Sequence, residues 1–190
     1  MSNLYDSTGI FFWPLALCSF LALFIIIERL IALRSSKIMP KELVESFVSG
    51  KVVDYNGDLK TVGGRIVYFF KRTNPDPDAL KAFARLELAR LERGMFILEI
   101  VVGAAPLLGL LGTVTGLIQV FEGIDVSGTP DPGQFVKGIA LALTTTMIGL
   151  SIAIPALVGN SYLSRRVDML AVRINMGVER LIDLSRERRA

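Results

Sequence analysis

Three stretches of the chain are apolar and uncharged over the length that a membrane crossing needs, which is about 20 residues. They run from Gly9 to Ile27, from Ile100 to Phe121 and from Gly138 to Ser164. The first has no basic start and no clear cleavage site, and it continues into Glu28 and Arg29. We therefore interpret it as a retained span rather than a secretory signal. The pattern predicts an all-α, polytopic membrane protein with three transmembrane helices.

The polar segments after the first and third spans predict helices that extend from the membrane into water. Residues 74–78, with the sequence NPDPD, provide capping groups and proline at a helix start. We expect one helix to run from about Asp78 to Glu122, roughly 67 Å at 1.5 Å per residue. The third span continues into a tail with apolar positions three or four apart, which either continues the helix or lies flat on anionic lipid. These positions are Val167, Leu170, Ile174, Val178 and Leu181.

Basic residues indicate the orientation, because cytoplasmic flanks of membrane spans retain lysine and arginine. Of the 21 lysines and arginines, Lys137 alone lies on the side of the link between spans two and three. The N-terminus and that link are therefore expected to face outward. The expected segments are an outer N-terminus with helix 1 (1–33), a cytoplasmic helical segment (34–93), helix 2 (94–122), a short outer link (123–134), helix 3 (135–164) and a cytoplasmic helical tail (165–190).

Composition narrows the chemistry. The 190 residues are 52% hydrophobic and 21% charged, and they include no histidine and one cysteine, Cys18. Imidazole metal sites, Ser/His or Cys/His nucleophiles and an internal disulfide are thereby excluded. The net charge of +3 follows the membrane topology, so we expect no nucleic-acid partner. We expect no catalytic residue, metal or cofactor.

Small residues recur along one face of the second and third spans. Lipid gives helices no hydrophobic reason to associate, so close backbone approach through small side chains is the usual way for them to pack. The spacing predicts that the two spans are antiparallel neighbours or line a shared surface, and ordinary helix packing would explain the same pattern. The residues are Ala105, Gly109, Gly112 and Gly116 in span two, and Ala142, Thr146, Gly149, Ala153, Ala156 and Asn160 in span three.

Five threonines supply hydroxyl groups in the same two spans: Thr113, Thr115, Thr144, Thr145 and Thr146. Each can satisfy its hydroxyl on a carbonyl of the preceding turn, or together they can form a polar track. A hydroxyl cannot be the group that loads and releases a proton. If protons move along these helices, an acid must come from elsewhere.

Acids within the chain lie at the edges of the spans rather than at the bilayer centre, where a charge costs at least about 2.5 to 3.5 kcal/mol. Glu99, at the inner edge of span two, is the best candidate for an ionisable contributor. A boundary residue whose carboxylate reaches the interface is the simpler interpretation.

Two runs of sequence resemble the signatures of the MotA/TolQ/ExbB family. The first is APLLGLLGTVTG at residues 105–116, and the second combines GIALALTTTMIGL at 138–150 with AIPA at 153–156. Pro106 and Pro155 belong to these runs and are expected to shape their helices. The resemblance covers roughly the second half of the chain in motif and all of it in topology. Three spans with a short outer link are similar to ExbB and TolQ rather than to MotA, which has four.

The resemblance implies a bacterial inner-membrane stator subunit, with its N-terminus in the periplasm and its C-terminus in the cytoplasm. Such subunits form a ring, commonly a pentamer, around two single-span ExbD- or TolR-like partners, whose output reaches a TonB- or TolA-like protein. The partner helix carries an essential aspartate, which fits the missing acid. Thr113 and Thr146 fall where the family places its pore-facing threonines, with Thr115 and Thr145 as further candidates for the proton path.

One position departs from that pattern. Many ExbB and TolQ sequences have glutamate where this chain has Leu141. Either the mechanism in this chain does not use a second carboxylate within the ring, or Glu99 performs a related role. Two other classes of function stay open, namely a self-sufficient ion channel or transporter and a membrane scaffold that conducts no ions.

Overall fold

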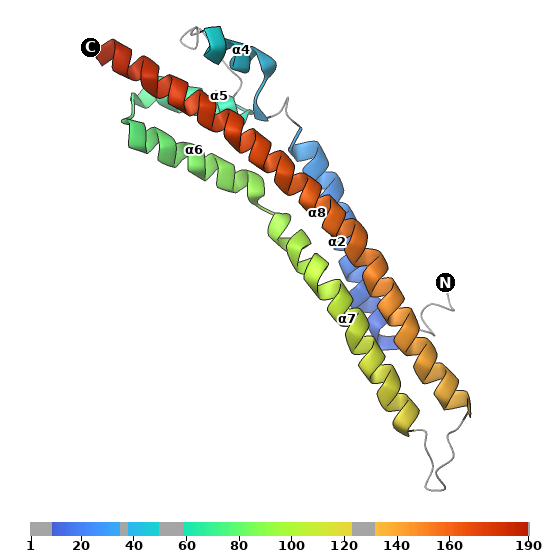
Figure 1. The fold of residues 1–190 in the computed structure, drawn as a ribbon. Coiled ribbons are helices and arrows are strands. Elements are labelled where there is room, and N and C mark those ends of the chain that lie inside the picture. Colours follow the sequence, from blue (N-terminus) through green and yellow to red (C-terminus); the bar gives the residue numbers. More distant parts are fainter. Residues whose placement is uncertain (1–8, 35–37, 50–58, 123–131, 190) are drawn as a thin grey trace. The chain divides into compact units, whose positions relative to one another are not determined.

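The computed structural model of the chain describes residues 9–34, 38–49, 59–122 and 132–189, and all regular structure in these ranges is helical. Three of the helical segments are long and apolar enough to cross a membrane, namely Gly9–Ala32, Met95–Glu122 and Pro132–Glu187. The all-α prediction with three spans is thus confirmed. In chain order the elements are η1 (Gly9–Phe11), α2 (Phe12–Ala32), α4 (Lys41–Ser49), α5 (Val62–Thr73), α6 (Pro77–Glu92), α7 (Met95–Glu122) and α8 (Pro132–Arg189) (Figure 1).

The chain divides into two compact units. We call Met1–Ile27 with Gly94–Ser161 the spanning unit, and Glu28–Arg93 with Tyr162–Ala190 the polar unit. Helix α8 contributes to both, because it continues without interruption from Pro132 to Arg189. The predicted continuation of the third span into a helical tail is therefore confirmed. The tail's apolar stripe is buried, with Val167, Leu170, Ile174, Val178 and Leu181 each at most 3% exposed. Most of the predicted outer link, 123–131, lies outside the described residues.

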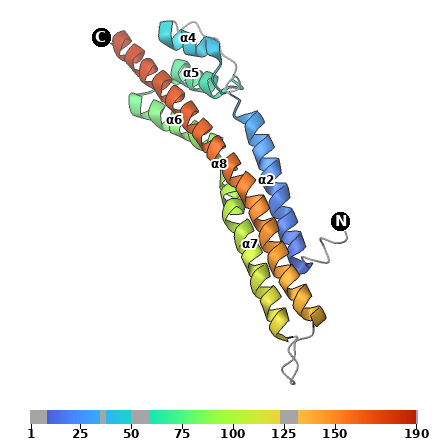
Figure 2. The same ribbon diagram turned by 45° about the vertical axis from the view of Figure 1, so that its right-hand side comes forward.

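In the spanning unit, α7 and α8 run side by side in opposite directions and α2 lies alongside them (Figures 1 and 2). The outward faces are apolar, as Phe20, Leu107 and Leu143 show with exposed fractions of 65%, 64% and 68%. Apolar surface of this extent is suited to lipid rather than to water. The chain is a multi-pass membrane protein.

In the polar unit, α5 and α6 are bounded by capping residues. Asn74 follows α5 with φ 41°, in the left-handed region, and its N–H donates to the carbonyl of Phe70 at 3.1 Å. The Asp76 carboxylate then accepts a hydrogen bond from the N–H of Ala79 at 2.9 Å, with Pro77 in the first turn of α6. These contacts satisfy backbone groups that a helix end leaves unpaired. The helix start predicted within residues 74–78 is confirmed.

A buried carboxylate joins α5 to α6. Glu87 is 0% exposed. Its Oε2 accepts hydrogen bonds from Arg65 Nε at 3.0 Å and Arg65 Nη2 at 2.5 Å. Its Oε1 accepts one from Arg90 Nη1 at 2.6 Å. Two guanidinium groups thus compensate for removing one carboxylate from water, which would otherwise be costly.

The prediction of a single helix over 78–122 is wrong. Helix α6 ends at Glu92 and α7 begins at Met95. Between them Arg93 has ψ 127°, outside the helical region, and Gly94 has φ +95°. Glycine adopts positive φ at no steric cost, so the chain breaks its helix here. The two helices belong to different units.

An arginine from the end of α2 contacts the end of α6. Arg29 Nη1 donates to the carbonyl of Leu91 at 3.4 Å, and its Nε lies 2.8 Å from the carboxylate of Glu28. The last carbonyls of a helix have no partner within that helix. Arg29 therefore gives one of these carbonyls, two residues before the C-cap of α6, a hydrogen-bond partner.

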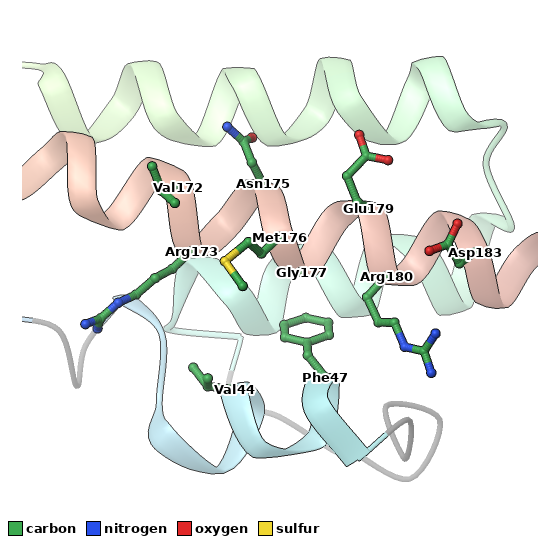
Figure 3. A pocket seen from close by; sticks show the side chains of 10 residues that line it. All are labelled: Val44, Phe47, Val172, Arg173, Asn175, Met176, Gly177, Glu179, Arg180 and Asp183. Atoms are coloured by element: carbon green, nitrogen blue, oxygen red, sulfur yellow. The ribbon is translucent and has the colours of Figure 1, made fainter.

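A groove runs between α4 and the part of α8 that lies in the polar unit (Figure 3). It measures about 730 Å³. At its floor the ring of Phe47 lies against Gly177, where a methyl group would come within 2.7 Å of Phe47 Cε2. In Figure 3, Arg173 and Arg180 point toward the α4 side, while Glu179 points toward α6. Glu179 there forms an ion pair with Lys81 of α6 at 2.9 Å.

Candidate functional site

Helices α7 and α8 meet through the small residues of the predicted face. A methyl group on Gly109 would lie 2.9 Å from the carbonyl oxygen of Thr145, and one on Gly149 would lie 2.6 Å from that of Ala105. A methyl group on Gly112 would collide with the Thr145 side chain. The two backbones are therefore close enough that a larger residue has no room at these positions.

The same contacts define an antiparallel register. Gly116 lies against Gly138, while Gly109, seven residues earlier, lies against Thr145, seven residues later. Ala142 and Ala153 are buried on the same face of α8, each 7% exposed. Gly138 is a contact residue that the sequence reasoning did not select, although it opens the second motif run. Reciprocal glycines on both helices explain the close approach, as in other membrane helix pairs.

Thr145 is enclosed in this contact. Its side chain is 0% exposed. Its Oγ1 lies within hydrogen-bond distance of three carbonyl oxygens, those of Leu141 at 2.8 Å, Ala142 at 3.2 Å and Gly109 at 3.3 Å. Thr145 was expected among the path residues, but in this chain its hydroxyl lies inside the α7–α8 contact and faces no open surface.

The other threonines use their hydroxyls in two ways. Thr113 donates to the carbonyl of Leu110 at 2.6 Å, and Thr115 donates to that of Leu111 at 3.0 Å. Both bonds stay within α7 and run to the preceding turn. Thr146 instead donates across to α7, to the carbonyl of Gly109 at 3.2 Å. A hydroxyl oxygen that donates keeps two lone pairs that can accept.

The antiparallel register divides the hydroxyls between two sides of the pair. One residue advances about 100° around an α-helix. Thr113 directly follows the contact residue Gly112, and Thr146 directly follows the contact residue Thr145. In two antiparallel helices, residues that follow the contact position by one lie on the same side of the pair. Thr115 and Thr144 each precede a contact residue, Gly116 or Thr145, and lie on the opposite side. The five threonines therefore do not form a single track.

Two further residues from the sequence reasoning have clear places. Glu99 lies in the second turn of α7 and is exposed. Leu141, at which the sequence departs from the pattern expected of ExbB and TolQ, is 9% exposed, and its carbonyl oxygen accepts a hydrogen bond from the Thr145 hydroxyl. Its side chain is thus part of the packed interior of the spanning unit.

The two prolines lie inside the long helices. Pro106 is in α7 and Pro155 is in α8. Proline has no N–H, so each removes one hydrogen bond from its helix. Pro106 directly follows the buried contact residue Ala105.

Comparison with known proteins places these features in a family. Residues 69–176 match the profile of the MotA/TolQ/ExbB proton channel family. An ExbB-like biopolymer transport protein of Synechocystis sp. is 34% identical over 164 residues, which cover 78% of this chain and 65% of that protein. Biopolymer transport protein exbB1 of Vibrio cholerae is 29% identical over 194 residues, covering 92% of this chain and 83% of the relative. Biopolymer transport protein ExbB of Aquifex aeolicus is 32% identical over 127 residues, covering 67% of this chain and 84% of the relative.

The matched region contains all of α7, the contact face of α8 and the threonines described above. The family is named for a proton channel, and these relatives are named for biopolymer transport rather than for an enzymatic reaction. The close antiparallel helix pair, its hydroxyl groups and these matches lead to one conclusion: this chain belongs to the MotA/TolQ/ExbB proton channel family, and among the named relatives it is similar to ExbB proteins.

Proposed function

We propose that the chain is a ring-forming stator subunit of a bacterial inner membrane, which couples proton flow to work at the cell envelope. One observation carries the proposal. Thr113 and Thr146 lie on the same side of the α7–α8 pair, and neither helix has a charged residue between Glu99 and Glu122 or between Lys137 and Arg165. A side with hydroxyls but no acid at mid-membrane can solvate a carboxyl group, yet it cannot exchange protons by itself.

The acid is supplied by a partner, a dimer of a single-span ExbD- or TolR-like protein with an aspartate in its membrane helix. A charged carboxylate at the bilayer centre is costly. Protonation neutralises it, and the partner helix can then turn past Thr113 and Thr146. The Thr146 oxygen donates to Gly109 but still has lone pairs to accept a hydrogen bond from the protonated carboxyl group. Each charge that crosses 100 mV supplies about 2.3 kcal/mol.

The ring follows from the need to enclose that side. Copies arranged around an axis, five by analogy with the family, would surround the partner helices with α7 and α8. The N-terminus would face the periplasm and the C-terminus the cytoplasm, because the basic residues gather on one side. Work would leave through the partner to a TonB- or TolA-like protein and so to transport or maintenance of the envelope.

The test compares two threonines on opposite sides of α8. Thr146→Val keeps the shape and removes the hydroxyl, and Thr144→Val makes the same change two residues away. The chain and its partner are reconstituted in vesicles, and proton uptake at a fixed potential is followed with a pH-sensitive dye. We expect Thr146→Val to lower uptake at least tenfold and Thr144→Val to change it less than twofold. Equal uptake in both variants and the wild type would contradict the proposal.

Vesicles with the chain alone separate the other classes of function. A self-sufficient channel would conduct without the partner. A scaffold that conducts no ions would support envelope transport in cells even after the membrane potential is abolished.

A further inference from the structure

Glu99 lies apart from the other charged side chains of the spanning unit. The described residues of the spanning unit contain three charged side chains, Glu99, Glu122 and Lys137. Glu122 is the last residue of α7 and Lys137 lies near the start of α8, and these two ends are adjacent because Gly116 packs against Gly138. Glu99 therefore stands alone at the other end of the unit, in the second turn of α7. Its side chain is exposed rather than packed against α8.

The helix register places Glu99 on the side that carries Thr113 and Thr146. Leu98, its neighbour in sequence, is 0% exposed, so Glu99 follows a buried position by one residue, as Thr113 follows Gly112. Glu99 and Thr113 are also 14 residues apart, which is close to four full helical turns, or about 21 Å. The carboxylate and the Thr113 hydroxyl thus lie on one line along α7.

Asn160 lies near this side on α8, turned about 40° around the helix from Thr146 toward the contact with α7. It follows Thr146 by 14 residues and is half-buried. Gly149 packs against Ala105, so Glu99 is level with Pro155, and Asn160 lies about 7 Å further along the axis. An asparagine amide can donate a hydrogen bond to a carboxylate and accept one from a carboxylic acid. The inner end of this side therefore carries one acid and one amide.

The rest of this side is apolar. Val102, Pro106 and Leu110 separate Glu99 from Thr113 on α7, and Leu117 and Phe121 continue the line beyond Thr113. Polar groups accordingly occur at two levels, the hydroxyls near the middle and Glu99 with Asn160 at the inner end. At about 21 Å from Thr113, Glu99 is too distant to hydrogen-bond a carboxyl group held at the threonines.

We propose that Glu99 is the inner proton-exchange site on the side of the α7–α8 pair that carries Thr113 and Thr146, with Asn160 as its positioning residue. This rests on the proposed function. The partner acid releases its proton to water, and the carboxylate of Glu99 binds that proton and then passes it to water on the inner side, so that only O–H bonds form and break.

The experiment uses the chain with its partner in vesicles, and measures proton flux as a function of pH on the inner side. Glu99→Gln removes the carboxylate, and Glu122→Gln makes the same change at the other end of α7. We expect Glu99→Gln to lower flux at least tenfold and to abolish its dependence on inner pH, and Glu122→Gln to leave flux within twofold of the wild type. Glu99→Asp, which keeps the acid, should retain flux and shift the midpoint of the pH profile.

Asn160→Ala tests the positioning role, and it should shift the midpoint of the same profile while leaving flux measurable. A wild-type pH profile in Glu99→Gln would overturn the proposal. If Thr146→Val abolishes flux while Glu99→Gln does not, this inference fails and the proposed function stands. If the wild-type complex conducts no protons at all, the proposed function fails as well. Should Glu99→Gln not assemble, the midpoint measured in Glu99→Asp decides, because an unshifted midpoint excludes Glu99.

Discussion

The two units solve the problem of holding helices together in opposite ways. In the spanning unit, α7 and α8 approach through glycines, and its described part has three charged residues. In the polar unit, helices are joined by apolar side chains and by ion pairs, above all the contact of Glu87 with Arg65 and Arg90. Packing in the spanning unit depends on glycines, which have no side chain, whereas packing in the polar unit depends on long side chains.

The surroundings explain the difference. In water the hydrophobic effect favours the burial of apolar side chains, so helices in the polar unit can associate through large residues. In lipid this driving force is absent, and van der Waals contact between close backbones stabilises the helix pair instead. A change that adds a methyl group should therefore harm the spanning unit most, whereas a change that removes a side chain should harm the polar unit most.

The largest expected effect comes from Arg65→Ala in the polar unit. It leaves the fully buried Glu87 carboxylate with Arg90 alone, and breaking a buried ion pair costs about 3 to 5 kcal/mol. We expect the free energy of local opening to fall by about 3 kcal/mol, measured from hydrogen exchange of α5 and α6. Arg85→Ala, at an exposed position on α6, is the control and should change it by less than about 0.5 kcal/mol. The double variant Arg65→Leu with Glu87→Met should regain most of the loss, and a double variant as unstable as the single one would contradict this account.

The next effect tests the spanning unit with two glycines of α7. Gly112→Ala forces a methyl group against the Thr145 side chain, whereas Gly103→Ala places one where no atom lies within 4 Å. Overpacking typically costs about 1 to 3 kcal/mol. Thermal unfolding in detergent, followed by circular dichroism, should show a lower midpoint for Gly112→Ala and an unchanged or higher one for Gly103→Ala. The same midpoint in both variants would mean that the close approach of α7 and α8 does not stabilise the unit.

A smaller effect is expected at the start of α6. Asp76→Ala removes the side chain that accepts the N–H of Ala79, and the loss of such a cap costs about 1 kcal/mol. Hydrogen exchange in the first turn of α6 should accelerate accordingly. Asp76→Asn retains an acceptor and should behave as the wild type. Equal acceleration in both variants would indicate that the charge, rather than the hydrogen bond, stabilises this helix start.

The smallest effect concerns the ion pair of Lys81 with Glu179, whose side chains are 41% and 59% exposed. Exposed pairs contribute about 0.2 to 1 kcal/mol and are weakened by salt. Lys81→Met should therefore shift the unfolding midpoint only slightly at low salt and not at all at high salt. A large shift that persists at high salt would show that this pair acts like the buried one at Glu87.

The sequence was most informative where a local property determines the structure. The three spans follow from runs without charge, and the buried stripe of the α8 tail follows from its spacing. The start of α6 was also predictable, because Asp76 and Pro77 provide capping within a few residues. The break at Gly94 was not predicted, because the spacing of apolar residues does not reveal that α6 and α7 belong to different units.

Features that depend on pairing between distant segments were not predictable. The carboxylate of Glu87 finds Arg65, 22 residues away, only once α5 and α6 have packed. Thr145 and Thr146 are neighbours in sequence, yet one is enclosed and the other borders an open side, because the register with α7 decides which face each occupies. Composition identified the hydroxyls as a group, whereas the antiparallel pairing divides them.

The unbroken course of α8 has a mechanical consequence. Thr146 and Arg189 belong to one helix, so the helical hydrogen bonding beside the threonines continues without a break into the polar unit. Helix α7 has no comparable continuation, because the chain leaves helical geometry at Arg93 and Gly94. A change beside the threonines can therefore reach the polar unit through the backbone of α8, whereas along α7 the helical backbone is interrupted.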